Sequence, residues 1–222
     1  MALARKSEQE RRAELIAATI REVAAVGSLD VTTSQIAKSA GVSSGLAFHY
    51  FKDKNSLFLA AMAHILTRYG QDVRRGLAEA RTPQERLASI ARASFNNRNF
   101  TKEAIHAWLI FYSLALRSPA ARRLLYIYQR RLHSNLVYNL RPLIGETAPD
   151  VARRIGGLID GLYLRYALDT SSDDNQAASE HVLRAIAAEC TEIHENEEIS
   201  IDEADPSPMA PIAKPPLVGG QE

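Results

Sequence analysis

The stretch TTSQIAKSAGVSSGLAFHYF, residues 32–51, decides the fold of this chain. Ile36 and Ala37 give a short helix an apolar side with a small residue, where a second helix can cross closely. Gly41 permits a left-handed turn, and Ser43 can accept hydrogen bonds from the free amides of the next helix. Two short helices that flank a glycine in this way form a helix-turn-helix.

The second helix of this motif leaves mostly small and polar side chains facing outward. They are Ser44, Gly45, Leu46, His49 and Tyr50. Such a helix is unusual unless it is inserted into something, and the major groove of DNA, about 12 Å wide, admits one helix. The alternative is a buried helical hairpin that binds no DNA, in which His49 simply packs.

Outside the motif, the sequence predicts an all-α fold of about nine helices. Apolar residues recur at steps of three and four, and no useful length alternates with period two. Gly27 ends the first helix, Asp53 can cap a long helix after the motif, and Thr82-Pro83-Gln84-Glu85 forms a capping box. The expected helices are 8–26, 34–40, 43–50, 53–80, 82–97, 101–117, 118–141, 149–168 and one that begins at Asp173 or Asp174.

The chain divides into three parts. We expect a helix-turn-helix DNA-binding domain at residues 8–68 and a helical ligand-binding and dimerisation domain at 69–197. Five of the nine prolines fall in the last 17 residues, after an acidic run. Residues 198–222 are therefore expected to be a disordered tail.

Composition excludes several classes of protein. With 46% hydrophobic and 24% charged residues, the 222-residue chain has the proportions of a globular protein. The single cysteine, Cys190, cannot form an intramolecular disulfide, and no apolar run reaches 18 residues. We expect a cytoplasmic protein with no membrane segment, no metal and no cofactor.

Charge is unevenly distributed. Residues 81–142 carry 11 basic and 2 acidic residues, whereas residues 143–222 carry 5 basic and 16 acidic residues. A basic segment can attract nucleic acid, but it can equally be the solvated face of a helix. Charge alone does not decide between these interpretations.

Residues 8–68 resemble the DNA-binding domain of the TetR family of transcriptional regulators. The matching residues are Thr32-Thr33, Ile36-Ala37, Ala40-Gly41-Val42-Ser43, Gly45, His49-Tyr50-Phe51, Lys52-Asp53-Lys54 and Leu57. The whole set in register is far more specific than a lone Ala-Gly-Val-Ser. One departure is Phe48, since the family usually has Tyr there, which removes one phosphate-binding hydroxyl.

The resemblance implies a DNA-binding role for eight residues: Thr33, Ser34, Ser44, Gly45, Leu46, His49, Tyr50 and Lys54. Those at the start of the second motif helix would approach base edges, and Thr33, Tyr50 and Lys54 would hold phosphates. The residues support two of these roles independently. Lys54 lies in the first turn of a helix, where free amides favour an anion, and Tyr50 offers a hydroxyl.

A single helix-turn-helix makes few contacts, so such regulators dimerise over two half-sites about 34–36 Å apart on a pseudo-palindromic operator. The segment IGGLIDGLYL, residues 155–164, is apolar almost all round and needs burial on both sides. The resemblance places Gly156, Gly157, Gly161 and Leu164 in a homodimer interface. The alternative is that the glycines pack within the chain.

Aromatic residues gather in the second half of the chain. Trp108, Phe111 and Tyr112, at spacings i, i+3 and i+4, put three rings on one helix face, and Tyr163 follows later. An aromatic stripe is more often core than ligand cage, and both interpretations stay open at this point.

Residues 6–190 are similar to the BetI-type repressors of this family. The similar segments are Ala107-Trp108-Leu109, Arg130-Arg131-Leu132, Ser134-Asn135-Leu136-Val137, Leu158-Ile159-Asp160-Gly161-Leu162 and Leu164-Arg165. These repressors control the conversion of choline to glycine betaine and the uptake of choline, and they respond to choline. The resemblance implies a homodimeric repressor that leaves operator DNA when choline or a related quaternary ammonium binds.

The chemistry of the aromatic residues fits such a ligand. A quaternary ammonium has no N–H to donate, so aromatic faces recognise it, each contributing about 0.5–2 kcal/mol. We expect the four rings named above to surround the ligand and Asp160 to balance its charge. Asp160 can instead be an ordinary ion-pair partner of Arg165 or Arg117.

Two rival functions remain. One keeps the fold but senses a hydrophobic or aromatic compound and controls an efflux or catabolic gene. The other is a helical interaction module without DNA binding, for which Phe48 is the only hint. An enzyme is not expected, since the sequence has no Ser/His/Asp arrangement, no HExxH motif and no phosphate-binding glycine-rich loop.

Overall fold

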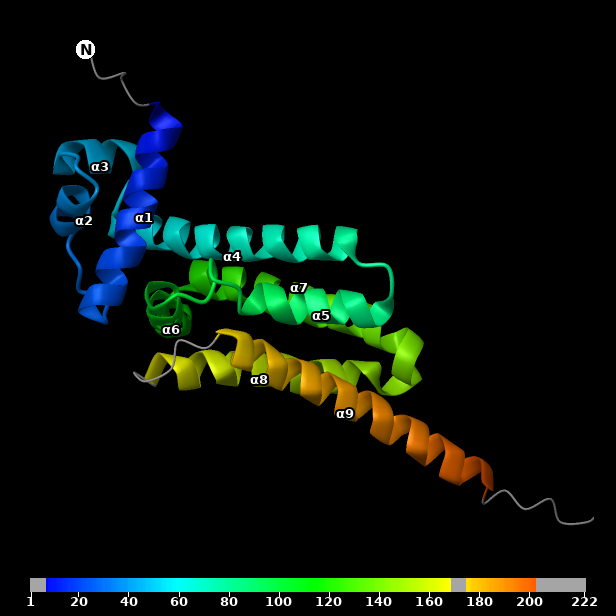
Figure 1. Cartoon of the computed structure of the whole chain (residues 1–222). Coiled ribbons are helices and arrows are strands. Elements are labelled where there is room, and N and C mark those ends of the chain that lie inside the picture. Colours follow the sequence, from blue (N-terminus) through cyan, green and yellow to red (C-terminus); the bar gives the residue numbers. More distant parts are fainter. Residues whose placement is uncertain (1–6, 169–174, 203–222) are drawn as a thin grey trace, which may run out of the picture.

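The computed structural model describes residues 7–168 and 175–202, and these residues are arranged as helices (Figure 1). Within the two described segments there are nine α-helices, one short 3-10 turn and no strand, so the all-α prediction is confirmed. The α-helices are α1 (Glu8–Val26), α2 (Thr33–Ser39), α3 (Ser44–Tyr50), α4 (Lys54–Glu79), α5 (Pro83–Ser94), α6 (Lys102–Arg117), α7 (Pro119–Ile144), α8 (Ala148–Leu168) and α9 (Asn175–Asp202).

Side-chain caps explain where the helices begin. Thr82 and Glu85 form the predicted capping box of α5, and Asp53 caps α4 by accepting a hydrogen bond from Ser56 N at 2.7 Å. Thr32 and Gln35 form a further capping box at the start of α2. Gly27 ends α1 with φ 69°, a left-handed conformation that glycine adopts without a Cβ penalty.

The C-terminal boundary differs from the expectation. Helix α9 continues to Asp202, so residues 198–202 are helical and do not belong to a disordered tail. The break in composition lies after this point, because the prolines that stop a helix begin only at Pro206. The expected disorder of residues 203–222 and the expected cap at Asp173 or Asp174 lie outside the described residues.

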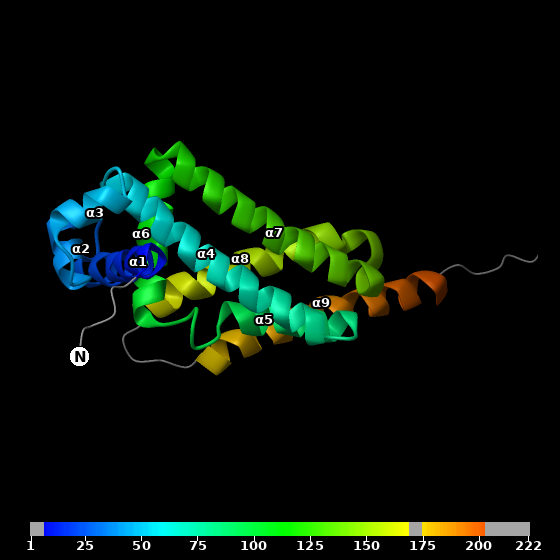
Figure 2. The ribbon, with the colours of Figure 1, turned by 90° about the horizontal axis from the view of Figure 1, so that it is seen from above.

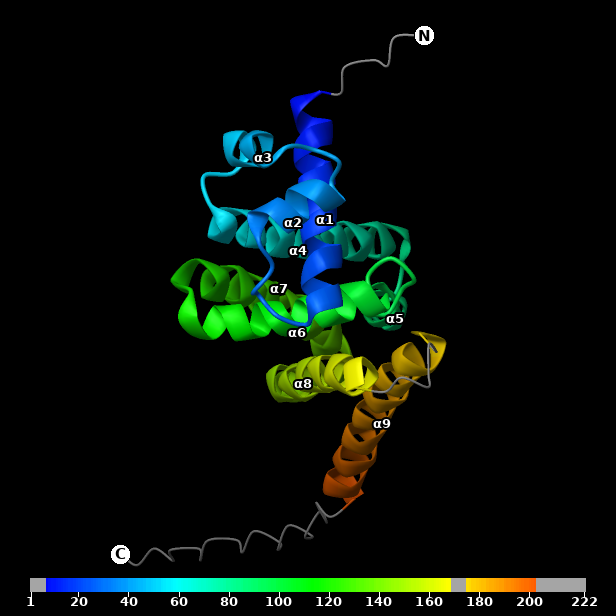
Figure 3. The ribbon, with the colours of Figure 1, turned by 90° about the vertical axis from the view of Figure 1, so that its left-hand side faces the viewer.

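The helices form a head and three layers. Helices α1–α3 gather at one end of the molecule, and α4 runs from this head across a layer of α5, α6 and α7 (Figures 1 and 2). Helices α8 and α9 lie on the side of that layer away from α4, which the end view also shows (Figure 3). Residue 68, where we expected the first domain to end, lies inside the unbroken helix α4.

Two hydrophobic cores hold these parts together. One combines residues of α1–α4 with Trp108, Phe111 and their neighbours on α6, and the other joins α5, α7, α8 and α9. Tyr128 and Tyr163 pack against both cores. The head is therefore bound to the rest of the chain through α6 as well as through α4.

Among the helices of the described residues, none combines the length and the hydrophobicity that crossing a membrane requires.

Candidate nucleic-acid interface and ligand site

The helix-turn-helix has one buried side and one open side. Ala47, 1% exposed, is the buried residue of α3, and it joins Ile36 and Ala37 of α2 in the core of the head. On the open side of α3, Gly45 and His49 are exposed. The open side is thus the one that carries the residues predicted to approach DNA.

Four of the eight predicted DNA-binding residues are brought together in pairs. Ser44 Oγ donates to Ser34 Oγ at 3.2 Å, which joins the first turns of α3 and α2. The rings of His49 and Tyr50 meet edge to face, with centroids 5.2 Å apart. Thr33 and Leu46 are half-buried on the same two helices.

Lys54 occupies the first turn of α4, but its ammonium group already has a partner in the free protein. Lys54 Nζ donates to Leu29 O at 3.1 Å, which ties α4 to the connection between α1 and α2. An ammonium group has three hydrogens, so two remain for a phosphate. The side chain can therefore position the α1–α2 connection and bind an anion at the same time.

Arg12 was not predicted as a site residue, yet it holds the end of α3. Its Nη1 donates to Tyr50 O at 2.7 Å, and its guanidinium carbon lies 4.5 Å from the centroid of the Phe51 ring. In the sequence Arg12 resembles any basic residue on the solvated face of a helix. Only the fold shows that α1 passes beside the C-terminal end of α3.

An aromatic cluster lies where the two cores meet. The Trp108 ring contacts the rings of Tyr112 and Tyr128 edge to face, at centroid distances of 5.2 and 5.3 Å. Tyr128 in turn contacts Tyr69 of α4, at 5.5 Å. These rings come from α4, α6 and α7, so the cluster joins the helix that leaves the head to the helices beneath it.

A small cavity of about 20 Å³ lies within this cluster. Among its lining residues are Tyr69, Trp108, Tyr128, Tyr163 and Asn99. A water molecule needs about 10–15 Å³ of such space, so the cavity has room for about one water molecule. Two predicted ligand residues, Trp108 and Tyr163, line it.

Phe111, by contrast, does not line the cavity. It is 0% exposed and belongs to the core that α6 shares with α1 and α4. The i, i+3, i+4 spacing places Trp108, Phe111 and Tyr112 near one another, but it does not show which neighbouring helix each ring meets. The structure therefore places Phe111 in the core between the head and α6.

Asp160 of α8 has a carboxylate oxygen without a hydrogen-bond partner. Within the described residues, neither Asp160 Oδ1 nor the neighbouring Tyr112 Oη, both fully buried atoms, has a hydrogen bond of normal geometry. Burial raises the pKa of the Asp160 carboxyl, and the nearby Tyr112 hydroxyl partly offsets this effect. Burial and the Asp160 charge likewise raise the pKa of Tyr112.

The ion pairs considered for Asp160 are not formed. In the described part of the chain, Asp160 pairs with neither Arg165 nor Arg117. A buried acceptor left without a partner costs about 1–3 kcal/mol, more if it is charged. The half-buried acid thus lies beside the Tyr112 hydroxyl without an ion-pair partner among the described residues.

Tyr69, Tyr128 and Asn99 are site residues that the sequence analysis did not single out for the ligand site. Tyr69 Oη accepts a hydrogen bond from Ser94 Oγ at 3.4 Å, and burial raises the pKa of Tyr69 to about 12. Asn99 Nδ2 donates to Asp72 Oδ2 of α4 at 2.9 Å, which fixes the connection before α6. The sequence contains no signal that could have identified these three residues, because they meet Trp108 only in the folded chain.

The glycines of α8 face open space. A Cβ atom on Gly156, Gly157 or Gly161 would meet no other atom within 4 Å, and Leu164 is 50% exposed. Within the described protomer, packing therefore does not require these glycines, which argues against the intramolecular alternative. An apolar, small-residue surface of this kind is available to another chain.

Among the described residues, no three His, Cys, Asp or Glu side chains are grouped in a way that could hold a metal ion.

Two family models match the chain in separate parts. The model described as bacterial regulatory proteins, tetR family, matches residues 15–61, which contain the helix-turn-helix. The model described as BetI-type transcriptional repressor, C-terminal, matches residues 83–191, which contain the aromatic cluster and Asp160.

Similar proteins support both matches. The HTH-type transcriptional regulator BetI of Brucella anthropi is 50% identical over 173 residues, covering 78% of this chain and 88% of that protein. Its namesake from Rhizobium meliloti is 42% identical over 165 residues, covering 74% of this chain and 81% of that protein.

Solved structures share the fold at low sequence identity. A transcriptional regulator from Pseudomonas aeruginosa has a TM-score of 0.75 at 23% identity, covering 87% of this chain and 96% of its own. A regulator from Saccharomonospora viridis, solved in complex with choline, has a TM-score of 0.71 at 19% identity, covering 81% of this chain and 97% of its own.

Proposed function

Because this chain belongs to the TetR family of transcriptional regulators and carries a BetI-type repressor domain, we propose that it is a choline-responsive repressor. As a homodimer it binds a pseudo-palindromic operator. It controls genes for choline uptake and for the conversion of choline to glycine betaine. Choline binding releases it from the DNA.

The single observation that carries the choline proposal is the Asp160 carboxylate, which forms no ion pair among the described residues and lies beside Tyr112, whose ring contacts that of Trp108. A trimethylammonium group supplies the missing positive charge without needing an acceptor for an N–H. It also gains from contact with aromatic faces, by about 0.5–2 kcal/mol each. A neutral aromatic ligand would leave the Asp160 charge uncompensated.

Choline must separate the rings in order to bind. The cavity of about 20 Å³ does not accommodate a trimethylammonium group, so the closed cluster is the ligand-free state. Trp108 belongs to the same core as α1 and the first half of α4. Displacing its ring therefore changes the packing beneath the head.

Through this change in packing, ligand binding would lower the affinity of the head for DNA. Helix α4 leads from Lys54, beside the α1–α2 connection, to Tyr69 in the cavity wall. A ligand that favours the non-reading state by about 1–3 kcal/mol weakens DNA binding about 5- to 150-fold. The same coupling requires DNA to weaken choline binding by the same factor.

Dimerisation completes the DNA-binding unit. Two heads must be held at a fixed spacing to read two half-sites. The open glycine surface of α8, with exposed Leu164, supports a close helix contact between two protomers. The contact lies on the side of the α5–α7 layer away from α4 (Figure 1).

The test is binding of the purified protein to a labelled DNA fragment from upstream of its own gene, with choline as titrant and glycine betaine as control. Choline should release the DNA, and the Asp160→Asn variant should bind the DNA equally well but resist choline. DNA binding that ignores choline would retain the regulator and reject choline, which favours an efflux or catabolic role. Absence of DNA binding at low salt would reject the repressor itself.

A further inference from the structure

We infer that the groove between α4 and α7 is a second ligand site, which binds an organic anion with an apolar tail. The groove has a volume of about 710 Å³ and is lined from α4 by residues such as Leu66, Val73 and Arg74, and from α7 by residues such as Arg131 and Asn135. Small-molecule sites usually measure about 300–1,000 Å³. This site is separate from the choline proposal and does not depend on it.

Charge selects an anion. The lining contains the three arginines Arg74, Arg130 and Arg131, and it contains no acidic residue. No ion pair or hydrogen bond joins any of the three guanidinium groups to another residue in the described part of the chain. A guanidinium group binds a carboxylate or phosphate through two parallel hydrogen bonds, so it has a free binding edge here.

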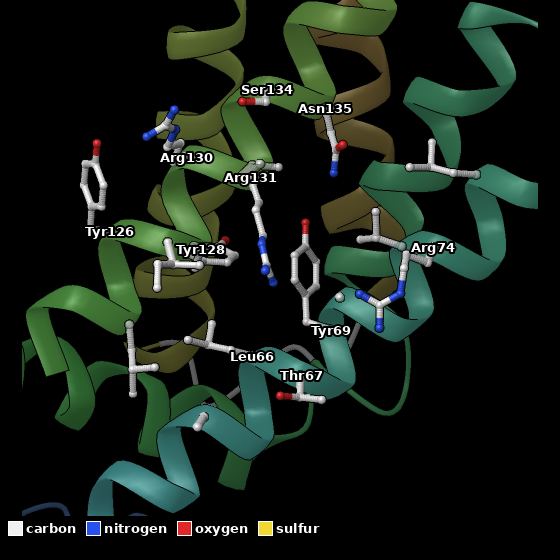
Figure 4. Close-up of a pocket in the computed structure, with 17 residues that line it drawn as sticks. Leu66, Thr67, Tyr69, Arg74, Tyr126, Tyr128, Arg130, Arg131, Ser134 and Asn135 are labelled. Atoms are coloured by element: carbon white, nitrogen blue, oxygen red, sulfur yellow. The ribbon is translucent and has the colours of Figure 1, made fainter. Parts of the chain in front are cut away.

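The labelled side chains in the close-up indicate where the anion would be held. Figure 4 shows Arg131 and Asn135 projecting from α7 toward Tyr69 of α4, while Arg74 stands at the α4 edge. Arg130 and Tyr126 point away from this convergence, at the outer edge of the groove (Figure 4). The anionic group is therefore assigned to Arg131 and Arg74.

The rest of the lining suits an apolar tail. Leu66, Val73 and Leu77 of α4 face the groove together with Leu124 and Leu132 of α7. Leu66, Leu77 and Leu124 are only half-buried, so a small anion without a tail would leave them in contact with water. Burying an alkyl chain against them gains up to about 0.8 kcal/mol per methylene, which explains why an amphipathic anion fits better than a small inorganic one.

The groove and the aromatic cavity are adjacent but prefer opposite charges. Leu66, Tyr69 and Tyr128 line both, so they form the wall between them. Asp160 does not line the cavity, but burial and the Asp160 charge both raise the pKa of Tyr69 in this wall, whereas the groove side carries the arginines. A ligand in the groove would press on Tyr69 and Tyr128 from the opposite face.

The groove is also accessible in the proposed assembly. The glycine surface of α8 lies on the other side of the α5–α7 layer, as two perpendicular views show (Figures 1 and 3). A dimer through α8 would therefore leave the groove open to solvent. Arg130 and Arg131 belong to the basic excess of residues 81–142, and both line this groove. These two charges of the excess would therefore lie at the proposed anion site.

Calorimetric titration tests this site with two ligands of the same tail and opposite head groups, decanoate and decyltrimethylammonium, below their micelle-forming concentrations. We expect decanoate to bind at least about tenfold more tightly than decyltrimethylammonium. Hexanoate and octanoate should bind more weakly than decanoate, by up to about fourfold per methylene removed. These titrations use protein without DNA and are repeated on the Asp160→Asn variant, in which the proposed trimethylammonium site has lost its charge. The comparison of the two head groups therefore does not depend on operator binding or on the response to choline.

Variants locate the site. Arg131→Gln and Arg74→Gln should each weaken decanoate binding about tenfold, because each removes a charged donor. Arg123→Gln removes an exposed arginine of the same helix α7 that does not line the groove, and it should leave binding unchanged. Equal affinity for the two head groups, or decanoate binding that the double variant Arg74→Gln/Arg131→Gln leaves unaltered, would overturn the assignment.

Discussion

The open side of α3, where we propose that DNA binds, and the aromatic cluster differ in their exposure to solvent. The open side of α3 is exposed and is built from residues within one short stretch, with Gly45 and His49 facing solvent. The aromatic cluster is buried and draws Trp108, Tyr128 and Asp160 from three different helices. If both proposed sites are correct, the first surface can bind DNA as it stands, whereas the second must rearrange before a ligand can enter.

The comparison teaches how a ligand can control DNA binding in a chain of this size. A preformed reading face gives a fixed DNA affinity, which only its orientation can change. In the proposed mechanism the closed aromatic cluster opens when choline binds, and this cluster shares a core with the head through Trp108. Regulation is thus expected in the buried region and recognition in the exposed one.

The largest difference should appear in stability. Phe111→Ala removes a fully buried ring between α6 and the head and should lower the free energy of unfolding by about 3–5 kcal/mol. Phe48→Ala removes a ring that is 53% exposed on α3 and should change that free energy by no more than about 0.5 kcal/mol. Urea unfolding measures both, and similar losses for the two variants would contradict the division into a buried and an exposed region.

The next effect concerns DNA alone. A Cβ on Gly45 meets no atom within 4 Å in the free protein, so Gly45→Leu should fold normally. Its side chain would stand between α3 and the base edges, and operator affinity should fall about 100-fold or more. Fluorescence anisotropy with labelled operator gives the affinity, and thermal unfolding gives the control. Operator binding at full strength would show that Gly45 does not approach the DNA.

A smaller effect is expected at Asp160. Asp160→Asn keeps the shape of the side chain and removes its charge, so choline affinity should fall about tenfold. Operator binding without choline should stay unchanged, because Asp160 belongs to the buried region. Calorimetry with choline measures the first quantity. The matched variant Asp150→Asn, which alters an exposed acid in the first turn of the same helix, should bind choline normally.

The same variant should alter the pH dependence of stability. Burial raises the pKa of the Asp160 carboxyl, so the folded state holds this proton more tightly than the unfolded state. Stability that Asp160 contributes in its neutral form is therefore present at low pH and decreases as pH rises from the unfolded value of about 3.9 through the higher folded value. The difference between the Tm of Asp160→Asn and the Tm of the native chain should therefore increase as the pH rises above about 4. A parallel course of the two Tm curves would show that the carboxyl is ionised as easily as in water.

The smallest effect should come from Lys54. Lys54→Gln removes one phosphate-binding charge, so it should weaken binding to all DNA sequences alike and reduce the salt slope by about one. Arg92→Gln, an exposed change on α5, serves as the control for net charge. Binding should be measured on operator and unrelated DNA at several salt concentrations. An unchanged slope would limit Lys54 to its hydrogen bond with Leu29 O.

Many helix starts, in the head and beyond it, could be predicted because their determinants are local. The caps at Ser43, Asp53 and Thr82 each depend on residues no more than three positions away, and the structure has helices beginning at all three. Helix α9 shows the limit of this reasoning, since its end at Asp202 was expected near residue 197. Acidic residues without prolines do not by themselves end a helix.

The ligand region was only partly predicted. Of the five predicted ligand residues, Trp108 and Tyr163 line the aromatic cavity, whereas Phe111, Tyr112 and Asp160 do not, and Phe111 is a core residue. Their role in ligand binding stays a prediction. Tyr69 and Arg12 were overlooked, because their importance depends on contacts with Tyr128 and Tyr50, which are far away in the sequence. Residue type and spacing define the faces of one helix, but they do not show which residues of other helices pack against each face.

From the amino-acid sequence alone we could predict the all-α class, the helix-turn-helix and the exposure of Gly45 and His49 on its second helix, but not that of Phe48. The spacing of apolar residues in a helix, the helix caps and the glycine turns all depend on residues that are close together in the sequence. Tertiary packing was needed to show that Asp160 Oδ1 is a buried atom without a hydrogen bond of normal geometry and that Arg74 and Arg131 line one groove. Burial and charge balance depend on which helices pack together, and that packing joins residues separated by many tens of positions.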